Sequence, residues 1–332
     1  MSAIISVKPR VMVARAVFPE HLEVLRQRYD LRDNQADIPL DAAQMQAACA
    51  SVEGALVTGS DRVDAAVIAA APALRYLSTI SVGYNHIDLA ACTARGILVT
   101  NTPDVLTETT ADMAWALLMA AARRITESEH WLRAGHWRQW SLGQMLGVDV
   151  HHATLGIVGM GRIGQAIARR AAGFAMRVVY HNRSRLPAEL ESACHATWLD
   201  LDSLLAEADH VMLVLPYSPS VHHLIDAPRL ARMKRGATLV NIARGGLIDE
   251  DALADALATG HLFAAGLDVF EGEPQVNPRL LALPNIALAP HSGSATRATR
   301  DAMARLAMRN LDDAFAGRRP PNLLNPEVWR GG

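Results

Sequence analysis

The stretch Thr154-Leu-Gly-Ile-Val-Gly-Met-Gly-Arg-Ile-Gly164 begins as an apolar strand and turns through three glycines into the helical run Gln165-Ala-Ile-Ala-Arg-Arg170. A Gly-x-Gly-x-x-Gly pattern between a strand and a helix is typical of a dinucleotide-binding turn. The first glycine would make the tight turn, the second would let the backbone approach a pyrophosphate, and the third would let the helix pack on the strand. The alternative is a tight turn without a ligand. We predict cofactor contacts at Gly159, Gly161, Arg162, Ile163 and Gly164.

The end of the next predicted strand indicates which dinucleotide is bound. The chain reads His181-Asn-Arg-Ser-Arg185 there, with no carboxylate before Glu189. An acidic residue at this point would bind the ribose hydroxyls of NAD, whereas an arginine pairs with the 2′-phosphate of NADP. We therefore predict NADP(H) as the preferred cofactor, with NAD(H) as the other option, bound through Asn182, Arg183 and Ser184. The alternative is a solvated basic turn.

The glycine motif belongs to the second of two series in which short apolar strands alternate with helices. Such alternation favours a parallel sheet with helices on both faces, so we predict an α/β fold of two doubly wound units. Strands are expected at 10–15, 53–58, 74–80 and 97–100, and then at 154–158, 177–181, 210–215, 238–242, 264–269 and 286–289. Helices are expected at 19–29, 41–51, 64–71, 88–95, 107–132 and 294–315, with a Trp- and Gly-rich loop at 135–147.

Length and composition exclude several classes of protein. The 332 residues favour two domains, and 32 Lys and Arg against 34 Asp and Glu leave no basic excess to drive nucleic-acid binding. The most apolar helical stretch, residues 113–122, is too short to span a bilayer. Lys8 and Arg10 follow the short apolar run of the N-terminus, unlike in a signal peptide. We therefore predict no nucleic-acid partner, no membrane partner and a cytoplasmic location.

Cysteine and histidine usage does not predict a metal site. The three cysteines lie far apart and are expected to be buried thiols: Cys49, Cys92 and Cys194. The doublets His151-His152 and His222-His223 consist of adjacent residues, whose side chains are expected to point in different directions. We therefore predict no bound metal, and we interpret His151 and His152 as structural or interface residues.

Three charged segments each follow a predicted strand of the second series: residues 241–249, 266–274 and 289–295. Open α/β sheets bind ligands at the carboxyl ends of their strands, so we expect Arg244, Glu273 and His291 to converge there. An arginine can grip a carboxylate bidentately, a histidine can donate a proton as hydride reaches carbon, and a glutamate can hold the imidazolium. This pattern predicts hydride transfer to a 2-oxo acid. Glu271 is interpreted as a solvated charge.

Together with the glycine motif, these segments resemble the D-isomer-specific 2-hydroxyacid dehydrogenase family over essentially the whole chain. The resemblance implies that Arg244 binds substrate, that Glu273 partners the histidine and that His291 is the general acid/base. It also implies a flavodoxin-like substrate domain of residues 1–105 plus 292–332, a Rossmann NAD(P)-binding domain of residues 106–291, and a cleft between them. The family further implies a homodimer formed through the cofactor domains.

The resemblance also assigns binding residues outside this triad. The backbone N–H groups of the loop at 81–85, at Val82 and Gly83, are expected to bind the substrate carboxylate, and Leu56 is expected to contact substrate, as are Arg244 and His291. Asp268 is expected near the nicotinamide carboxamide. Further cofactor contacts are expected at Thr110, Pro216, Ser218, Ile242, Ala243 and Gly293.

Residues 147–164 and the loop at 135–140 are similar to the bacterial glyoxylate/hydroxypyruvate reductases of this family, which also reduce 2-ketogluconate and mostly prefer NADPH. In that branch an aromatic loop of the neighbouring subunit closes the active site, so Trp137 and Trp140 either contact substrate or serve packing. Thr110 either caps its helix or touches the cofactor. Ser292 departs from the apolar residue usual in the family, and Tyr217-Ser218 replaces the usual Leu-Thr.

These observations predict an NADPH-preferring reductase of small 2-oxo acids, namely glyoxylate, hydroxypyruvate or 2-keto-D-gluconate, that forms D-2-hydroxy acids. One alternative is an NAD-linked D-2-hydroxyacid dehydrogenase of another substrate, which an acidic residue near Asn182 would have favoured. The other is a dinucleotide-sensing binding protein of the same fold, because such relatives retain the same three residues. A sensor would bind dinucleotide tightly and turn over slowly.

Overall fold

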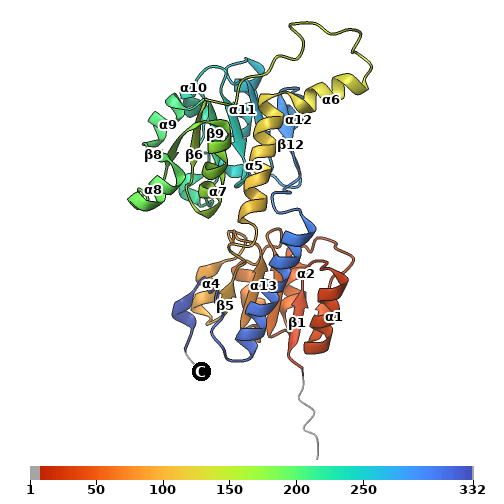
Figure 1. The fold of residues 1–332 in the computed structure, drawn as a ribbon. Helices are drawn as coiled ribbons and strands as arrows, with labels where there is room; N and C mark the ends of the chain where they lie inside the picture. Colours follow the sequence, from red (N-terminus) through yellow and green to blue (C-terminus); the bar gives the residue numbers. More distant parts are fainter. Residues whose placement is uncertain (1–7, 331–332) are drawn as a thin grey trace, which may run out of the picture. The chain divides into compact units, whose positions relative to one another are not determined.

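The computed structural model describes residues 8–330, and these divide into two units, the second of which is inserted in the chain of the first. The first comprises the described residues up to Leu106 and those from Thr296 onward; the second spans Thr107–Ala295 (Figure 1). The sequence places the second boundary between 291 and 292, whereas the structure groups residues 292–295 with the second unit. The physical reason is that the backbone N–H groups of Ser292 and Gly293 donate to Asp268 in that unit, both at 2.7 Å.

The first unit is built on a five-stranded parallel sheet in the order β2-β1-β3-β4-β5, which is the flavodoxin-like order. Its strands are β1 (Arg10–Val13), β2 (Asp30–Asp33), β3 (Gly54–Thr58), β4 (Tyr76–Ile80) and β5 (Leu98–Thr100). The sequence did not predict β2, because this edge strand reads Asp-Leu-Arg-Asp and lacks an apolar run. Its pairing with β1 is what makes it a strand.

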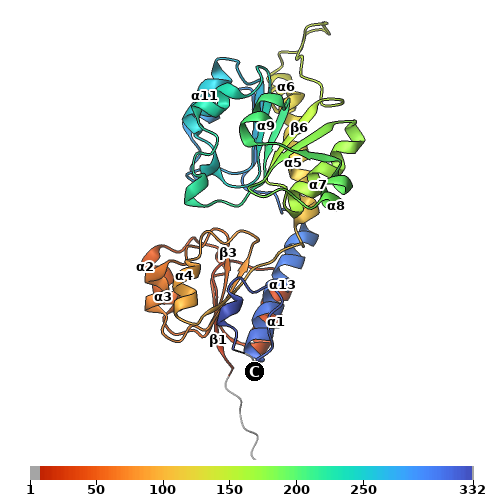
Figure 2. The ribbon, with the colours of Figure 1, turned by 90° about the vertical axis from the view of Figure 1, so that its left-hand side faces the viewer.

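Helices cover both faces of this first sheet (Figure 2). One face packs on α1 (Pro19–Arg28) and α13 (Arg297–Phe315), and the other on α2 (Ala42–Cys49), α3 (Ala65–Ala70) and α4 (Leu89–Ala94). Successive side chains of a central strand point into the two hydrophobic cores in turn. In β1, Val11 and Val13 face α13, whereas Met12 faces α2. The two buried faces explain why these strands read as continuous apolar runs.

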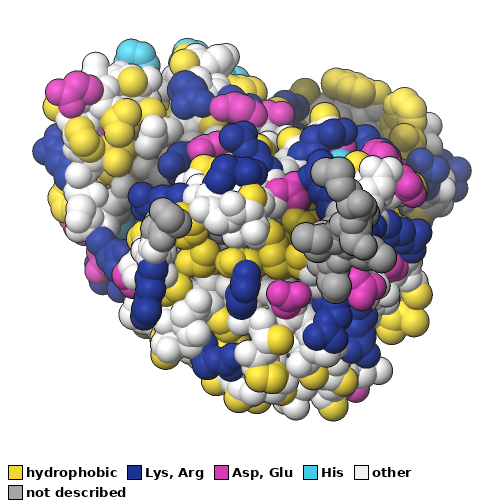
Figure 3. Space-filling model, turned by 90° about the horizontal axis from the view of Figure 1, so that it is seen from below, with side chains coloured by type: hydrophobic (Ala, Val, Ile, Leu, Met, Phe, Trp, Pro, Cys, Tyr) yellow, Lys and Arg dark blue, Asp and Glu magenta, His cyan; other side chains and the backbone are white. Residues whose placement is uncertain are grey.

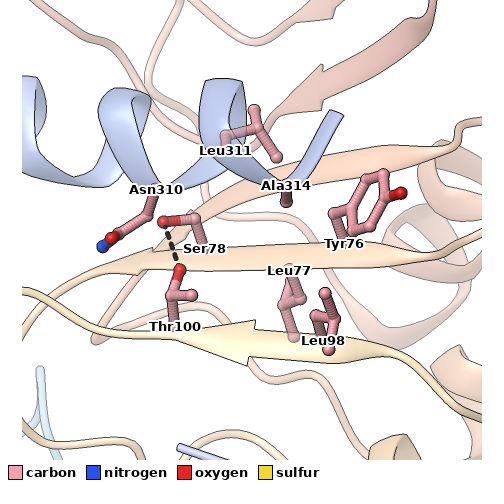
Figure 4. Close-up of a pocket in the computed structure, with 8 residues that line it drawn as sticks. All are labelled: Tyr76, Leu77, Ser78, Leu98, Thr100, Asn310, Leu311 and Ala314. Carbon is pink, nitrogen blue, oxygen red and sulfur yellow. Dashed lines mark hydrogen bonds between the residues drawn. The ribbon is translucent and has the colours of Figure 1, made fainter. Parts of the chain in front are cut away.

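Buried polar side chains tie α13 to the sheet of the first unit (Figure 4). Ser78 Oγ donates to the Ala307 carbonyl at 3.0 Å and accepts from Thr100 Oγ1 at 2.9 Å. Asn310 Nδ2, one helical turn beyond Ala307, donates to the Asn101 carbonyl at 3.0 Å. Because buried polar groups need partners, these bonds hold the C-terminal helix in one register on β4 and β5.

The second unit contains a seven-stranded parallel sheet in the order β12-β11-β10-β9-β6-β7-β8. Its strands are β6 (Thr154–Val158), β7 (Arg177–His181), β8 (Ala196–Trp198), β9 (His210–Leu213), β10 (Thr238–Asn241), β11 (Ala264–Leu267) and β12 (Ile286–Leu288). This is the Rossmann order with one further strand, and its direction of winding reverses between β6 and β9. The prediction of two doubly wound parallel sheets is confirmed. The short edge strand β8 was not predicted.

The second sheet is also covered on both faces. One face packs on α5 (Thr107–Ala122), α7 (Arg162–Ala171) and α8 (Ala188–Cys194). The other packs on α9 (Leu201–Glu207), α10 (Ala227–Arg232), α11 (Glu250–Ala258) and α12 (Pro278–Leu281). Ridges of small residues on α5 and α7 bring these two helices together; Ala111 and Ala166, for example, are fully buried in one cluster.

The predicted helix at 107–132 is two helices, α5 and α6 (Ile125–Arg133). Arg124 between them adopts a left-handed conformation with φ of 53°, which an α-helix does not contain. Its guanidinium donates to both carboxylate oxygens of Glu127, at 2.7 and 2.6 Å, and so holds the break. The long loop after α6 extends outward from the second unit (Figure 1).

The surface and the cysteines bear on the predictions from composition. Basic and acidic side chains are both distributed over the face drawn in Figure 3. Among the described residues, every helix is too short or too polar to cross a membrane. The three cysteines are buried and unpaired, as predicted, and burial raises the pKa of Cys49 to about 11 and of Cys92 to about 12.

Candidate active site

The glycine turn between β6 and α7 lies at the reversal point of the second sheet. Gly159 has a φ of +104°, and a Cβ there would lie 2.7 Å from the Leu215 backbone nitrogen. A Cβ on Gly164 would lie 2.3 Å from the Gly159 carbonyl oxygen, so both positions need glycine. A Cβ on Gly161 would meet nothing within 4 Å, which leaves open space in front of the α7 N-terminus. Within the described residues no side chain caps that terminus, so its N–H groups can bind a phosphate.

The basic turn after β7 contains one engaged arginine and one that is available. Arg185 Nε and Nη2 both donate to Glu191, each at 2.8 Å, and Tyr180 Oη donates to the same carboxylate at 2.6 Å. The hydrogen bond from Arg185, then that from Tyr180, lowers the pKa of Glu191 to about 2. Arg183 is exposed and has no hydrogen-bond or ion-pair partner in the described part of the chain.

Asn182 links this turn to the glycine loop. Its Oδ1 accepts from the Met160 N–H at 2.7 Å, and its carbonyl accepts from Trp198 Nε1 at 3.1 Å. The side chain that was predicted to contact cofactor therefore also sets the position of the glycine loop. Ser184, the third residue predicted here, is exposed. Asn182 thus joins the start of this basic turn to the glycine loop.

Arg244, Glu273 and His291 follow β10, β11 and β12, which are neighbours in the second sheet. His291 Nδ1 lies 2.7 Å from Glu273 Oε2, and Glu273 Oε1 accepts from the Phe270 N–H at 2.8 Å. A carboxylate only accepts, so the proton of this bond belongs to Nδ1 of His291, and Nε2 is free to exchange a proton with a ligand. The residues that we expected to converge from the sequence therefore share one edge of the sheet.

Charge interactions shape this group of three residues. Burial tends to raise the pKa of Glu273, but the hydrogen bond and charge of His291, the Phe270 N–H and the charge of Arg244 together hold it below its usual value. Burial lowers the pKa of Arg244, whereas the Glu273 carboxylate raises it. Arg244 is still a cation at physiological pH. At neutral pH the site therefore contains an ionised glutamate between a guanidinium and an imidazole.

Two residues that the sequence had not singled out for this purpose shape the loops of the site. Asn241 Oδ1 accepts from the Ala243 N–H at 3.0 Å, and its Nδ2 donates to the Arg244 carbonyl at 2.8 Å. Gly245 lies so close to the next loop that a Cβ would be 1.8 Å from the Phe270 carbonyl carbon. The arginine and glutamate segments therefore touch through their backbones. An asparagine at a strand end and a double glycine are the only signals that the sequence offered.

Asp268 was predicted to lie near the nicotinamide, and the structure shows it holding the loop that follows His291. Its carboxylate accepts from the N–H groups of Ser292 and Gly293, and Ser292 Oγ donates to Oδ1 at 3.2 Å. Burial raises the pKa of Asp268, and these hydrogen bonds oppose the rise. Ser292, which departs from the apolar residue usual in the family, therefore adds a side-chain hydrogen bond to Asp268.

The other predicted cofactor residues occupy the same edge of the second unit. Thr110 is the fourth residue of α5 and therefore not its cap; its methyl group would lie 3.4 Å from a Cβ on Gly293. Ile242 and Ala243 are largely buried in hydrophobic clusters. The remaining four are Arg162, exposed as the first residue of α7, Ile163, partly buried next to it, Pro216, exposed after β9, and Ser218, before a short 3-10 turn.

The residues predicted to bind substrate from the first unit differ in their environment. The loop after β4 is held in shape, because Ser81 Oγ donates to the Gly83 carbonyl at 2.7 Å and Asn101 Nδ2 donates to the Val82 carbonyl at 2.9 Å. Leu56, by contrast, is only 1% exposed and packs against α13 in the core. The prediction of a substrate contact for the Leu56 side chain is not supported, because the pleat of β3 turns it inward.

The two histidine doublets differ from each other. His151 and His152 stand edge to face at 85°, in agreement with side chains that point in different directions. His222 and His223 instead stack at 3.9 Å and 23°, so the prediction was wrong for this pair. A left-handed φ of 48° at His223 turns its side chain back beside its neighbour. Glu271, predicted to be a solvated charge, accepts from His223 Nε2 at 3.0 Å.

The aromatic loop between α6 and β6 contributes little to the core of its own chain. Trp140 is 75% exposed, and Trp137, Leu142 and Leu146 are exposed as well. Of the two roles that the sequence left open for Trp137 and Trp140, packing within their own chain is therefore not supported.

Comparison with known proteins identifies relatives over the whole length. A model of the NAD-binding domain of the D-isomer specific 2-hydroxyacid dehydrogenases matches residues 115–293. A glyoxylate reductase of Thermococcus onnurineus is 44% identical and covers 97% of each chain. A glyoxylate/hydroxypyruvate reductase B of Klebsiella pneumoniae is 44% identical over 97% of this chain and 99% of its own. A crystal structure of an NADPH-dependent glyoxylate/hydroxypyruvate reductase of Sinorhizobium meliloti, with NADP and malonate, has a TM-score of 0.83 at 33% identity, over 96% of this chain and 97% of the other.

Proposed function

The chain belongs to the D-isomer-specific 2-hydroxyacid dehydrogenase family and is an NAD(P)-dependent oxidoreductase, and from this premise we propose that it reduces glyoxylate and hydroxypyruvate with NADPH. The products are the corresponding 2-hydroxy acids, in the D configuration where the carbon is chiral. The observation that carries the proposal is the 2.7 Å bond between His291 Nδ1 and Glu273 at the strand edge that also presents Arg244. The larger 2-keto-D-gluconate is proposed as a further substrate.

Each residue of the triad has a distinct role in this reaction. The Arg244 guanidinium binds the carboxylate and polarises the keto oxygen, because its fork of donors matches two oxygens at once. His291, protonated at Nε2, donates that proton to the keto oxygen. Glu273 keeps the imidazole oriented through Nδ1 and stabilises its cationic form. The backbone N–H groups of Val82 and Gly83 are proposed as further donors to the substrate carboxylate.

The second unit, which carries the triad, is proposed to bind the dinucleotide. When bound, the nicotinamide supplies the hydride that adds to the keto carbon. The open space at Gly161 and the uncapped α7 N-terminus fit a pyrophosphate. The loop of Ser292 and Gly293, held by Asp268, is proposed to border the nicotinamide together with Thr110.

Preference for NADPH is proposed from the state of the two arginines in the turn after β7. Arg185 is engaged by Glu191, so Arg183 is the one that can pair with a 2′-phosphate. The turn carries no carboxylate that would repel the phosphate or bind the free ribose hydroxyls.

Initial rates with the purified protein test this function. NADPH and NADH would each be offered with glyoxylate, hydroxypyruvate and 2-ketogluconate, and nicotinamide oxidation would be followed by absorbance. We expect turnover on the first two acids and a higher kcat/KM with NADPH. Tight binding of dinucleotide without turnover on any of the three acids would contradict the reductase and favour a sensor.

We also propose a homodimer formed through the second unit, on the basis of the exposed apolar loop. Trp140 and Leu142 are 75% and 83% exposed, and contiguous exposed apolar surface usually marks an interface. We expect light scattering to give about twice the 35.8 kDa of one chain. The double variant Trp140→Ser, Leu142→Ser should shift the mass toward the monomer, whereas Ile38→Ser, exposed in the first unit, should not. A monomeric parent protein would refute the proposal.

A further inference from the structure

Three potential metal ligands lie together in the second unit, and the proposed reaction uses none of them. His222 and His223 follow the 3-10 turn at Pro219–Val221, and Glu271 follows β11. Nε2 of His222 lies 3.6 Å from Glu271 Oε1, and Nε2 of His223 lies 3.0 Å from Oε2. One ligand atom of each residue lies within 4.8 Å of the other two.

The spacing of these atoms is compatible with a zinc ion. With Zn–N of about 2.0–2.1 Å and Zn–O of about 2.0–2.2 Å, neighbouring ligand atoms of a tetrahedral site lie about 3.3–3.5 Å apart. The two nitrogen–oxygen distances, 3.6 Å to Oε1 and 3.0 Å to Oε2, fall on either side of this range and reach different oxygens of the carboxylate. Small rotations of side chains that are partly exposed would close the difference. Imidazole nitrogen with carboxylate oxygen is a donor set that Zn²⁺ and similar transition metals accept.

The surrounding structure holds the ligands in place. His222 Nδ1 lies 3.2 Å from Tyr217 Oη, the kind of outer contact that orients a ligating imidazole. The His223 N–H donates to the Gly246 carbonyl at 2.8 Å, and the Glu271 N–H donates to Glu250 Oε1 at 2.8 Å. A Cβ on Gly246 would lie 3.3 Å from His222 Nδ1 and 3.0 Å from the Tyr217 ring. The glycine therefore leaves room for the stacked histidines.

A second group of potential metal ligands differs from this cluster in the partners of its carboxylates. Glu20, His21 and Asp301 also lie close together in the first unit. There, Glu20 pairs with Arg297 and Asp301 pairs with Arg305, so both carboxylates are neutralised by guanidinium groups. At the cluster around Glu271 the carboxylate faces two imidazole rings instead, and imidazole nitrogen is itself a metal ligand.

We propose that His222, His223 and Glu271 bind one divalent transition-metal ion of the zinc class. The ion is held through both Nε2 atoms and one carboxylate oxygen, and a fourth position faces solvent because all three side chains are partly exposed. This site is independent of the proposed reductase function, since none of its ligands belongs to the triad or to the predicted binding residues.

Zinc titration of the tag-free, metal-stripped protein in competition with a chromophoric chelator tests this site. We expect one saturable Zn²⁺ per chain. Because loss of an outer contact alone typically weakens metal binding about 10–100-fold, His223→Ala and Glu271→Gln should each weaken it by at least about tenfold. Substituted Co²⁺ should show visible d–d absorption that both variants lose.

His151→Ala provides the matched control. It removes one histidine of the other exposed doublet, which also stands near a carboxylate, with His151 Nε2 3.7 Å from Asp149. This variant should bind Zn²⁺ like the parent. Equal weakening by His151→Ala, unchanged affinity in His223→Ala, or no saturable binding would each overturn the proposal. Thermal unfolding and NADPH binding of every variant would verify that a loss of zinc is not a loss of fold.

Discussion

Replacing His291 by alanine is expected to lower kcat for hydroxypyruvate reduction by about 10²–10⁴-fold, the usual contribution of a positioned acid–base group. Binding of NADPH should be essentially unchanged. Within the part of the chain that the structure describes, the imidazole hydrogen-bonds only Glu273, whereas the loop itself is held by backbone N–H bonds to Asp268. Stopped-flow and steady-state rates, with fluorescence titration of NADPH, measure the two quantities separately.

A second substitution controls for the backbone at this position. His291 has a φ of +50°, a conformation that asparagine tolerates better than alanine. His291→Asn should therefore fold as well as the parent and lose turnover as strongly as His291→Ala. If His291→Asn kept near-normal kcat, the assignment of the proton donor would be wrong. If instead both variants lost NADPH binding and kcat together, the residue would act by shaping the cofactor site.

Arg183→Asp is expected to reduce the ratio of kcat/KM for NADPH over that for NADH by roughly 10²-fold or more. A charged hydrogen bond to the 2′-phosphate is worth about 1.5–3 kcal/mol, and the new carboxylate adds repulsion. Each 1.4 kcal/mol corresponds to about tenfold. The carboxylate would also offer an acceptor to the ribose hydroxyls of NADH. Parallel steady-state kinetics with both cofactors give this ratio directly.

The neighbouring arginine supplies the matched control. Arg185 is bonded to Glu191, so Arg185→Gln should leave the cofactor ratio near that of the parent. It should instead lower thermal stability at neutral pH, because the pKa of Glu191 is depressed to about 2. A depressed carboxyl pKa contributes stability that is present above its unfolded value and is lost as pH falls toward 2. If Arg185→Gln changed the cofactor ratio and Arg183→Asp did not, the assignment of the two arginines would be reversed.

Much of the fold followed from local patterns. Buried parallel strands are continuous apolar runs, so β3, β6 and β10 were recognisable, and the flanking helices had clear periodicity. The edge strands β2 and β8 carry charged or mixed residues and exist only through pairing with β1 and β7. The break at Arg124 was equally invisible, because a left-handed residue is imposed there by Glu127 and by the loop that returns to Ala122.

The candidate site likewise contains residues that the sequence predicted and contacts that it did not. Arg244, Glu273 and His291 were predictable because each follows a strand, and strands in one parallel sheet end at one edge. The environment of Leu56 was not predictable in this way, because it lies in the middle of β3, where side chains on either face of the sheet are covered by helices. The tie between Asp268 and the loop of Ser292 and Gly293 joins residues 24 and 25 positions apart, and no local signal marks it.

By itself, the sequence determined the two doubly wound sheets, the dinucleotide turn and the three residues at the strand ends, because these depend on periodicity, glycine spacing and chain direction. Only the tertiary structure decided which arginine of the turn is available, since Arg185 is engaged by a glutamate on α8. It alone brought His222 and His223 against Glu271, 48 residues further along the chain than His223. Such contacts depend on how separate elements pack and on single residues with a left-handed backbone conformation. No local sequence pattern predicts them.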